Sequence, residues 1–314
     1  MSNKLFIFAI IHQLILYISA WDYFDQWEWP GICNTGSFQS PIDIITTSSE
    51  CSSYETFSLN LYDTARMAFI FENNSWIVNS NDTFGIFEAE DVNGVVQKYR
   101  SHSFSLHSIS EHKINGQRSN LELQLIFELD KSSPSITNHT MAIISVLFNS
   151  VSDNANATGF MEAVDMLYLE QQKDSRFSLN IRMNQLIGKL LIQKQNFTMY
   201  QGSLTYPTCD EIVNWYVVEK PLLINDHELS FFNSTYTQSE HYPKTGNARE
   251  IQLINARKIK RICNVTSRIE NLFQNPAFYF LLCFAGLGYA FWKYYGQIPA
   301  NKDQPIKGNI WTLH

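Results

Sequence analysis

Two short stretches of the chain carry side chains that could bind a metal ion or move a proton. In SFSLHS, strand alternation places Ser105 and His107 on one face, and in LELQLIFEL it places Glu122 and Gln124 on one face. Imidazole, carboxylate and amide groups are among the ligands of protein metal sites. A strand whose polar face meets solvent gives the same alternation, so these residues alone leave both interpretations open.

Both stretches are expected to be strands of one large β domain that spans residues 21–260. A longer helical or mixed pattern occurs only at 159–194, and NTGSFQSPIDI and YQGSLTYPTCDE are predicted to be loops. Many short strands in this length favour one domain over two. The clearest strand-like runs, each bounded by turn-forming residues, are TFSLNL (56–61), SWIVNS (75–80), SFSLHS (103–108), LELQLIFEL (121–129), MAIISVLF (141–148) and EIVNWYVV (211–218).

The composition argues against a nucleic-acid-binding surface. The 314 residues carry a formal charge of −7, and only 17% of them are charged. The one basic cluster, ARKIKR at 256–261, is short. Low-complexity segments and internal repeats are absent, which argues against a disordered chain and against a solenoid.

Apolar segments near both ends predict an export signal and a membrane anchor. Residues 1–20 begin with Lys4, continue as an apolar run and end in small residues, which is the layout of a secretory signal peptide. Residues 276–295 begin with an uncharged apolar run and are predicted to form one transmembrane helix. A juxtamembrane linker at 261–275 precedes it, and a cytoplasmic tail at 296–314 follows. The alternatives are an uncleaved anchor at the first segment and a buried core helix at the second.

Two signals conflict on the orientation of the chain in the membrane. Five basic residues precede the predicted span, and counting them places the upstream side in the cytoplasm. The signal peptide and the Asn-x-Ser/Thr sequons place it outside. We give the signal peptide more weight and expect a single-pass membrane protein of the secretory route with its N-terminal domain extracytoplasmic. The candidate glycosylation sites are Asn73, Asn81, Asn138, Asn156, Asn196, Asn233 and Asn264.

The five cysteines are consistent with a protein of the secretory route. Cys283 lies in the predicted span, whereas Cys33, Cys51, Cys209 and Cys263 lie in the exported part, where disulfides persist. Four cysteines allow three pairings, and their spacing does not choose among them.

Four stretches, in order along the chain, resemble the α-class carbonic anhydrases over about residues 21–255. They are WDY…GICNTGSFQSPIDI, SFSLHS…SEHKINGQRSNLELQLIF, YQGSLTYPTCDEIVNWYVVEKPLLI and YPKTGNAREI. The resemblance implies a mainly β fold with a large, twisted, mostly antiparallel sheet of about ten strands and short peripheral helices. It also implies a conical cavity with zinc at its base, held by three histidines.

By this resemblance the three zinc-ligand positions are Ser105, His107 and Gln124, of which only His107 is a competent zinc ligand. Serine is too short to reach the metal, and a neutral amide oxygen is a weak ligand for zinc. Glu122 matches the carboxylate that orients the third histidine, so it is expected to have lost its usual partner. No cofactor is therefore predicted. The alternatives are zinc in a rearranged site, or another metal bound by His107, Glu122 and Gln124.

Other family positions are partly kept. Thr205 and Glu111 match the pair that orients the zinc-bound hydroxide and are expected to persist as a buried hydrogen-bonded pair. The proton-shuttle position is Trp76, whose indole cannot relay a proton. The positions of the carbon dioxide pocket are Ile126, Ile143 and Trp215. The two isoleucines are expected to fill part of that pocket, because each adds a methylene to a tight space.

The resemblance also implies a disulfide between Cys33 and Cys209, which leaves Cys51 and Cys263 to pair with each other or with another chain. The predicted function is that of a membrane-anchored carbonic anhydrase-like protein, similar to the inactive carbonic anhydrase-related members, without carbon dioxide hydratase activity. Such a protein would bind a protein or glycan partner or have a structural role at a membrane surface. The alternatives are an active carbonate dehydratase with a rearranged metal site and an accessory subunit of a membrane complex.

Overall fold

The computed structural model describes one compact unit, which lies within Met1–Asn264. The described residues are 21–46, 51–52, 56–62, 65–72, 75–80, 83–133, 138–152, 176–181, 195–237 and 246–263. The predicted signal peptide, transmembrane helix and tail lie outside these residues. Within the part that is described, no helix is long and apolar enough to cross a membrane.

Strands dominate the described chain, and its two helices are a single 3₁₀ turn and α4. The elements are η1 (Gln26–Glu28), β1 (Asp43–Ile44), β2 (Cys51–Ser52), β3 (Phe57–Leu61), β4 (Ala65–Glu72), β5 (Ser75–Ser80), β6 (Gly85–Glu90), β7 (Val96–His107), β8 (Lys113–Ile114), β9 (Gln117–Arg118), β10 (Leu121–Leu129), β11 (Met141–Val151), β12 (Arg176–Ile181), β13 (Phe197–Gly202), β14 (Val213–Val218), β15 (Leu222–Asn225), α4 (Asp226–Thr237) and β16 (Ile259–Ile262).

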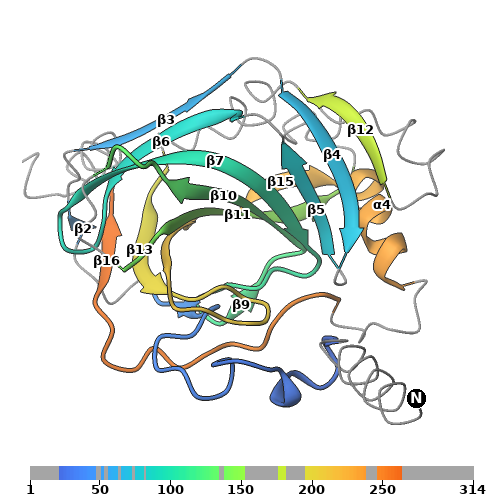
Figure 1. Cartoon of the computed structure of the whole chain (residues 1–314). Coiled ribbons are helices and arrows are strands. Elements are labelled where there is room, and N and C mark those ends of the chain that lie inside the picture. Colours follow the sequence, from blue (N-terminus) through green and yellow to red (C-terminus); the bar gives the residue numbers. More distant parts are fainter. Residues whose placement is uncertain are drawn as a thin grey trace, which may run out of the picture. The chain divides into compact units, whose positions relative to one another are not determined.

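A single large sheet organises these strands. Its main path runs β12-β4-β5-β7-β10-β11-β14-β13-β16-β2, and β3, β6 and β15 pair beside this path, which gives 13 strands within the described residues. Most neighbours are antiparallel, whereas β11 pairs in parallel with β14 and β15. Figure 1 shows the sheet as a strongly curved surface, with β7, β10 and β11 in its middle and α4 at one side. The predicted mainly β, twisted and mostly antiparallel fold is confirmed.

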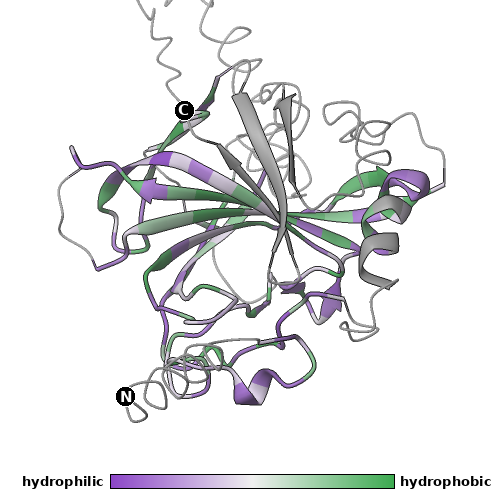
Figure 2. Cartoon of the chain, turned by 45° about the vertical axis from the view of Figure 1, so that its right-hand side comes forward, coloured by the Kyte–Doolittle hydropathy of each residue, from purple (hydrophilic) through white to green (hydrophobic). Residues whose placement is uncertain are grey.

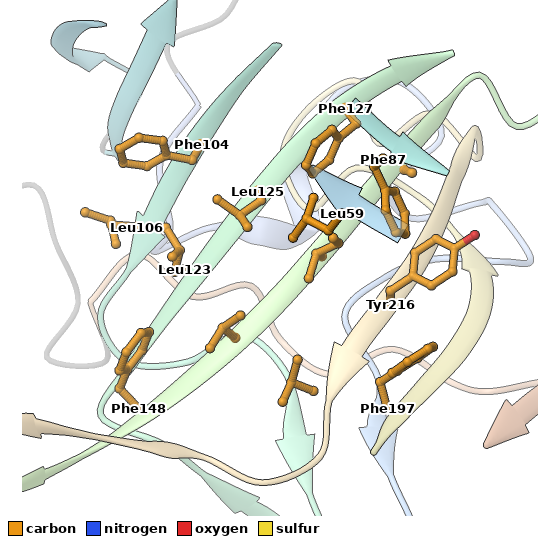
Figure 3. Close-up of a cluster of buried hydrophobic side chains, with 14 of the residues drawn as sticks. Leu59, Phe87, Phe104, Leu106, Leu123, Leu125, Phe127, Phe148, Phe197 and Tyr216 are labelled. Atoms are coloured by element: carbon orange, nitrogen blue, oxygen red, sulfur yellow. The ribbon is translucent and has the colours of Figure 1, made fainter. Parts of the chain in front are cut away.

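The apolar faces of the central strands build the main hydrophobic core. Phe104, Leu123, Leu125 and Phe127 are each 0% exposed, which matches the apolar face predicted for β7 and β10. Figure 3 shows these side chains packed with Phe87 from β6 and with residues of β13 and β14. In Figure 2, long hydrophobic stretches run along the strands, whereas the loops below the sheet are richer in hydrophilic residues. Burial of this one continuous core is the main favourable term for the fold.

The six predicted strands are all present, and the errors of prediction lie elsewhere. YQGSLTYPTCDE is not entirely a loop, because its first three residues complete β13. A Cβ at Gly202, where β13 ends, would collide with the side chains of Ser40 and Tyr200, so this close approach to β13 needs a glycine. The predicted helical or mixed stretch 159–194 contains β12, and α4 was not predicted.

Candidate functional site

The pairing of β7 with β10 brings the three ligand positions together. Ser105 lies opposite Gln124, and His107 lies opposite Glu122. The Ser105 hydroxyl oxygen is 3.3 Å from His107 Nε2 and 3.5 Å from Gln124 Oε1. These side chains do not meet solvent, since Ser105 is 7% exposed and His107 and Gln124 are each 2% exposed. The interpretation of a solvent-facing polar strand is therefore wrong.

Asn247 fixes the direction of the His107 ring. His107 Nδ1 donates to the backbone carbonyl of Asn247 at 2.9 Å, and this turns Nε2 toward Ser105. The Asn247 side chain is itself held, because it donates to the Leu106 carbonyl and accepts from the Ser108 N–H. The preceding Gly246 has a positive φ, and a Cβ there would strike the Ser108 carbonyl. Asn247 lies in the quoted stretch YPKTGNAREI, but the sequence alone assigns it no role.

Gln124 holds two buried carboxylates together. Its Nε2 donates to Glu111 Oε2 at 2.7 Å and to Glu122 Oε1 at 3.0 Å. Both glutamates are 0% exposed. Glu122 therefore has no histidine to orient at this position, and the amide of Gln124 donates to it instead. With both amide hydrogens used in this way, Oε1 is the atom that faces Ser105.

Glu122 is an ionised carboxylate with several donors. It accepts from the backbone N–H and the Nδ1 of His112, both at 2.8 Å, and from the Ser145 hydroxyl. Burial by itself raises the pKa of Glu122, but the charge of His112 and the hydrogen bonds from its side chain and backbone outweigh burial and lower the pKa to about 2. His112 Nε2 lies 2.7 Å from the Tyr200 hydroxyl. Sequence reasoning missed His112, although it directly follows Glu111 in the quoted SEH segment.

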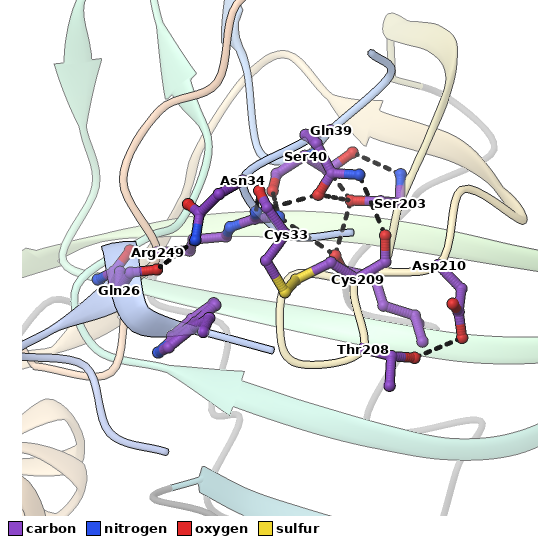
Figure 4. The surroundings of a disulfide bond; sticks show 12 residues. Gln26, Cys33, Asn34, Gln39, Ser40, Ser203, Thr208, Cys209, Asp210 and Arg249 are labelled. Atoms are coloured by element: carbon purple, nitrogen blue, oxygen red, sulfur yellow. Dashed lines mark hydrogen bonds between the residues drawn. A yellow bond between two sulfur atoms is a disulfide. The ribbon is translucent and has the colours of Figure 1, made fainter. Parts of the chain in front are cut away.

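Arg249 connects the site to the loop segment that contains Cys33 and Ser40. Its backbone N–H donates to Glu111 Oε1 at 3.1 Å, and its guanidinium donates to the carbonyls of Ser40 and Cys33, both at 2.7 Å. Figure 4 shows this guanidinium beside the Cys33–Cys209 disulfide. Burial lowers the pKa of Arg249 to about 10, so the side chain stays charged at neutral pH. The pairing of Cys33 with Cys209 that the resemblance implied is present.

The remaining two exported cysteines form a second disulfide, and three of the predicted glycosylation sites lie among the described residues. The structure pairs Cys51 with Cys263, which the sequence left open. Asn138 is exposed, and Asn196 and Asn233 are half-buried. The other sequons, Asn73, Asn81, Asn156 and Asn264, lie outside the described residues.

Glu111 lies at the site and Thr205 is buried, but no hydrogen bond joins the two among the described residues. Thr205 is 2% exposed. The Glu111 oxygens instead receive the Gln124 amide and the Arg249 backbone N–H. The amide at position 124 therefore donates to the carboxylate that the resemblance had paired with Thr205.

The carbon dioxide pocket positions form one row across three strands. Ile126 of β10 is paired with Ile143 of β11, and Ile143 is paired with Trp215 of β14. All three are buried in a second apolar cluster that includes Leu204. Trp76 belongs to β5, where its backbone pairs with Leu106 of β7, and its side chain lies outside the described structure.

The side chains at the ligand positions do not fit a zinc ion. They offer one imidazole nitrogen, one hydroxyl and one amide oxygen, whereas zinc sites use nitrogen, sulfur or carboxylate ligands. Among the residues whose positions are described, no group of three or more His, Cys, Asp or Glu side chains could hold a metal ion. The chemistry of the donor set is the stronger of these two observations.

The curved sheet and the residues that surround this site define a carbonic anhydrase-like protein. A profile of the eukaryotic-type carbonic anhydrase family matches residues 22–263, so the chain belongs to this family. Mouse carbonic anhydrase 4 is 27% identical over 243 residues, which cover 74% of this chain and 77% of that protein. Alpha carbonic anhydrase 7 of Arabidopsis thaliana is 25% identical and covers 74% of this chain and 76% of its own.

Solved structures share the fold at lower identity. Dioscorin in complex with ascorbate gives a TM-score of 0.62 at 21% identity and covers 79% of this chain and 99% of its own. The halotolerant carbonic anhydrase of Dunaliella salina gives a TM-score of 0.60 at 23% identity and covers 77% of this chain and 98% of its own. At these identities the likeness concerns the fold alone.

Proposed function

We propose that this protein is a membrane-anchored, carbonic anhydrase-like protein that does not hydrate carbon dioxide and that acts by binding a protein or glycan partner or as a structural component of a membrane surface. The observation that carries this proposal is the Gln124 amide, which bridges Glu111 and Glu122 where the family places its third zinc ligand. In this position the side chain satisfies two buried carboxylates and leaves only a weakly ligating oxygen, which faces Ser105.

The family chemistry explains why this change matters. A zinc ion held by three protein ligands lowers the pKa of its bound water from about 15.7 to about 7, which supplies hydroxide at neutral pH. Here a serine and a glutamine stand at two of the three ligand positions. With one strong ligand left, the ion is not retained, and the hydration reaction has no nucleophile.

Contacts of the basic cluster support an extracytoplasmic domain. Arg261 makes a bidentate pair with Glu219 across the sheet, Lys260 lies 3.6 Å from Glu90, and the Arg257 guanidinium donates to three backbone carbonyls. These charges belong to the folded domain and are not free to act as a cytoplasmic flank of the span. The two disulfides suit an oxidising compartment. Glycosidase-sensitive mass at Asn138 would support this orientation, whereas labelling of the domain from the cytoplasmic side would contradict it.

The experiment that tests the activity is a carbon dioxide hydration assay combined with metal analysis of the same purified sample. We expect no zinc at stoichiometric level and no rate above the uncatalysed reaction. Stoichiometric zinc with sulfonamide-sensitive hydration would instead support an active carbonate dehydratase with a rearranged site. Purification of the protein only together with other membrane proteins would support the role of an accessory subunit.

A further inference from the structure

Large apolar side chains are exposed on the N-terminal segment of the described domain. Trp27, in η1, is 71% exposed, and Phe24 and Ile32 are 49% and 38% exposed. The Asn34 amide donates to the Trp27 carbonyl at 2.7 Å, and the Thr35 N–H donates to the Ile32 carbonyl at 3.1 Å. The turn that holds Ile32 therefore lies against η1, which is the short dark-blue helix below the sheet in Figure 1. We name Phe24, Trp27 and Ile32 the Trp27 surface.

The backbone beneath the Trp27 surface is fixed by contacts with distant parts of the chain, although η1 belongs to no sheet. The Gln26 side chain donates to the Ala248 carbonyl at 3.1 Å and accepts from the Glu250 N–H at 2.8 Å. The Cys33–Cys209 disulfide holds the same segment at a second point (Figure 4). A partner would therefore find these apolar side chains already in place, and binding would require little ordering of this backbone.

The segment that carries the Trp27 surface is acidic. Residues 21–45 contain no Lys, Arg or His, and their carboxylates are Asp22, Asp25, Glu28 and Asp43. Asp25 and Glu28 flank Trp27 and are exposed, and neither side chain makes a hydrogen bond or an ion pair among the residues that the structure describes. Cleavage of the predicted signal peptide would add one ammonium group at Trp21, which still leaves an excess of negative charge.

The two loops bonded to this segment are acidic as well. The Ile32 N–H donates to the Thr208 carbonyl at 3.3 Å, in a loop that carries the exposed Asp210. Glu250, whose N–H bonds to the segment, is also exposed. The one cation that the structure describes in these two loops is Arg249, which is 2% exposed and donates inward to backbone carbonyls. A positively charged partner would therefore be attracted to this part of the domain.

We infer that the Trp27 surface is the docking site for a basic protein segment in which arginine or lysine side chains alternate with apolar ones. A guanidinium can stack on the exposed indole while it pairs with Asp25 or Glu28. Apolar side chains of the partner would cover Phe24 and Ile32. The same carboxylates would repel anionic lipids and anionic glycans. The inference rests on the proposed function, because it names the class of partner for a domain that acts by binding.

The test measures the binding of a fluorescent peptide of alternating arginine and leucine to the purified full-length chain in neutral detergent, by fluorescence anisotropy at low salt. We expect saturable binding that weakens about tenfold or more in Trp27→Ala, because exposed tryptophans dominate the energy of many interfaces. Glu28→Gln should weaken it about threefold, and this difference should shrink as salt is added.

Two variants are the matched controls. Leu253→Ala removes an apolar side chain that is 78% exposed on another loop, and Glu88→Gln removes an exposed carboxylate on β6. Neither should change the affinity for the peptide by more than about twofold. All four substituted side chains are exposed, so the variants should fold, which circular dichroism checks.

Three results would overturn the inference without touching the proposed function. The first is the absence of saturable peptide binding, and the second is equal affinity of Trp27→Ala and Leu253→Ala for the peptide. The third is binding that depends on Trp27 but is directed to vesicles containing phosphatidylserine, or to a neutral high-mannose oligosaccharide, in place of the peptide. Stoichiometric zinc with hydration activity in the same sample would instead reject the proposed function, so metal analysis separates the two failures.

Discussion

The contacts that join the three ligand positions to one another are longer than the hydrogen bonds of the residues behind them. Behind the ligand positions, hydrogen bonds are short: Glu122 accepts from His112 at 2.8 Å, and the Arg249 guanidinium reaches two carbonyls at 2.7 Å. Between the ligand positions themselves, the Ser105 hydroxyl lies 3.3 Å from His107 Nε2 and 3.5 Å from Gln124 Oε1, whereas the bonds from His107 and Gln124 to the residues behind them measure between 2.7 and 3.0 Å. The residues behind the ligand positions form a network of short hydrogen bonds, whereas the contacts that join the ligand positions to one another are long. Under the proposed function, metal ligation is lost at these positions while the network that holds the fold persists.

The largest effect is expected for Arg249→Met. The substitution removes donors from the carbonyls of Ser40 and Cys33 and from Gln39 Oε1, and all these groups are buried. We expect the free energy of unfolding to fall by about 3–5 kcal/mol, as measured by urea denaturation. Arg100→Met is the matched control: Arg100 pairs with Asp130 from a side chain that is 54% exposed, and its loss should cost less than about 1 kcal/mol. Equal losses of unfolding free energy for the two variants would contradict the claim that the buried contacts of Arg249 hold the fold.

Glu122 should make stability depend on pH below neutrality. Its pKa in the folded protein is about 2 against an ordinary value of 4.5, so its contribution is complete above pH 4.5 and is lost as the pH falls toward 2. The contribution is of the order of 3 kcal/mol. Urea unfolding at a series of pH values should show this slope in the wild type and a shallower slope in Glu122→Gln. Identical slopes would mean that the carboxylate is not held ionised as the structure implies.

Gln124→Leu should have an intermediate effect. The variant leaves Glu111 and Glu122 with one donor fewer each, and we expect a loss of about 2 kcal/mol. Gln117→Leu on β9 is the matched control, because Gln117 is exposed and its loss should change stability by less than about 0.5 kcal/mol. A neutral or stabilising effect of Gln124→Leu would show that the amide bridge is not a structural link.

The smallest effect is expected for Ser105→Ala. The hydroxyl makes only long contacts to His107 and Gln124, so its removal should change the free energy of unfolding by less than about 1 kcal/mol. A loss of unfolding free energy as large as that of Gln124→Leu would show that the Ser105 contacts stabilise the fold as much as the Gln124 bridge does.

Sequence reasoning reached the strands and the site but not the network around it. Alternation in β7 and β10 predicted which side chains share a face, and the structure confirms this because the apolar faces are buried together. The hydrogen bonds of His112 and Asn247 join residues 10 to 140 positions apart, so no local pattern reveals them. The new partner of Glu122 was missed for a related reason. By its resemblance Gln124 stands at a ligand position, and nothing local in the sequence shows that its amide donates to two carboxylates.

Zinc titration of the metal-free protein tests the central claim most directly. Isothermal calorimetry on the wild type and on the double variant Ser105→His/Gln124→His compares the present site with one that has three histidines on the same strands. We expect no specific binding to the wild type and binding of one zinc ion per chain to the variant, because the register of β7 and β10 already brings the three positions together. Stoichiometric zinc binding by the wild type, or a folded double variant that binds none, would contradict it.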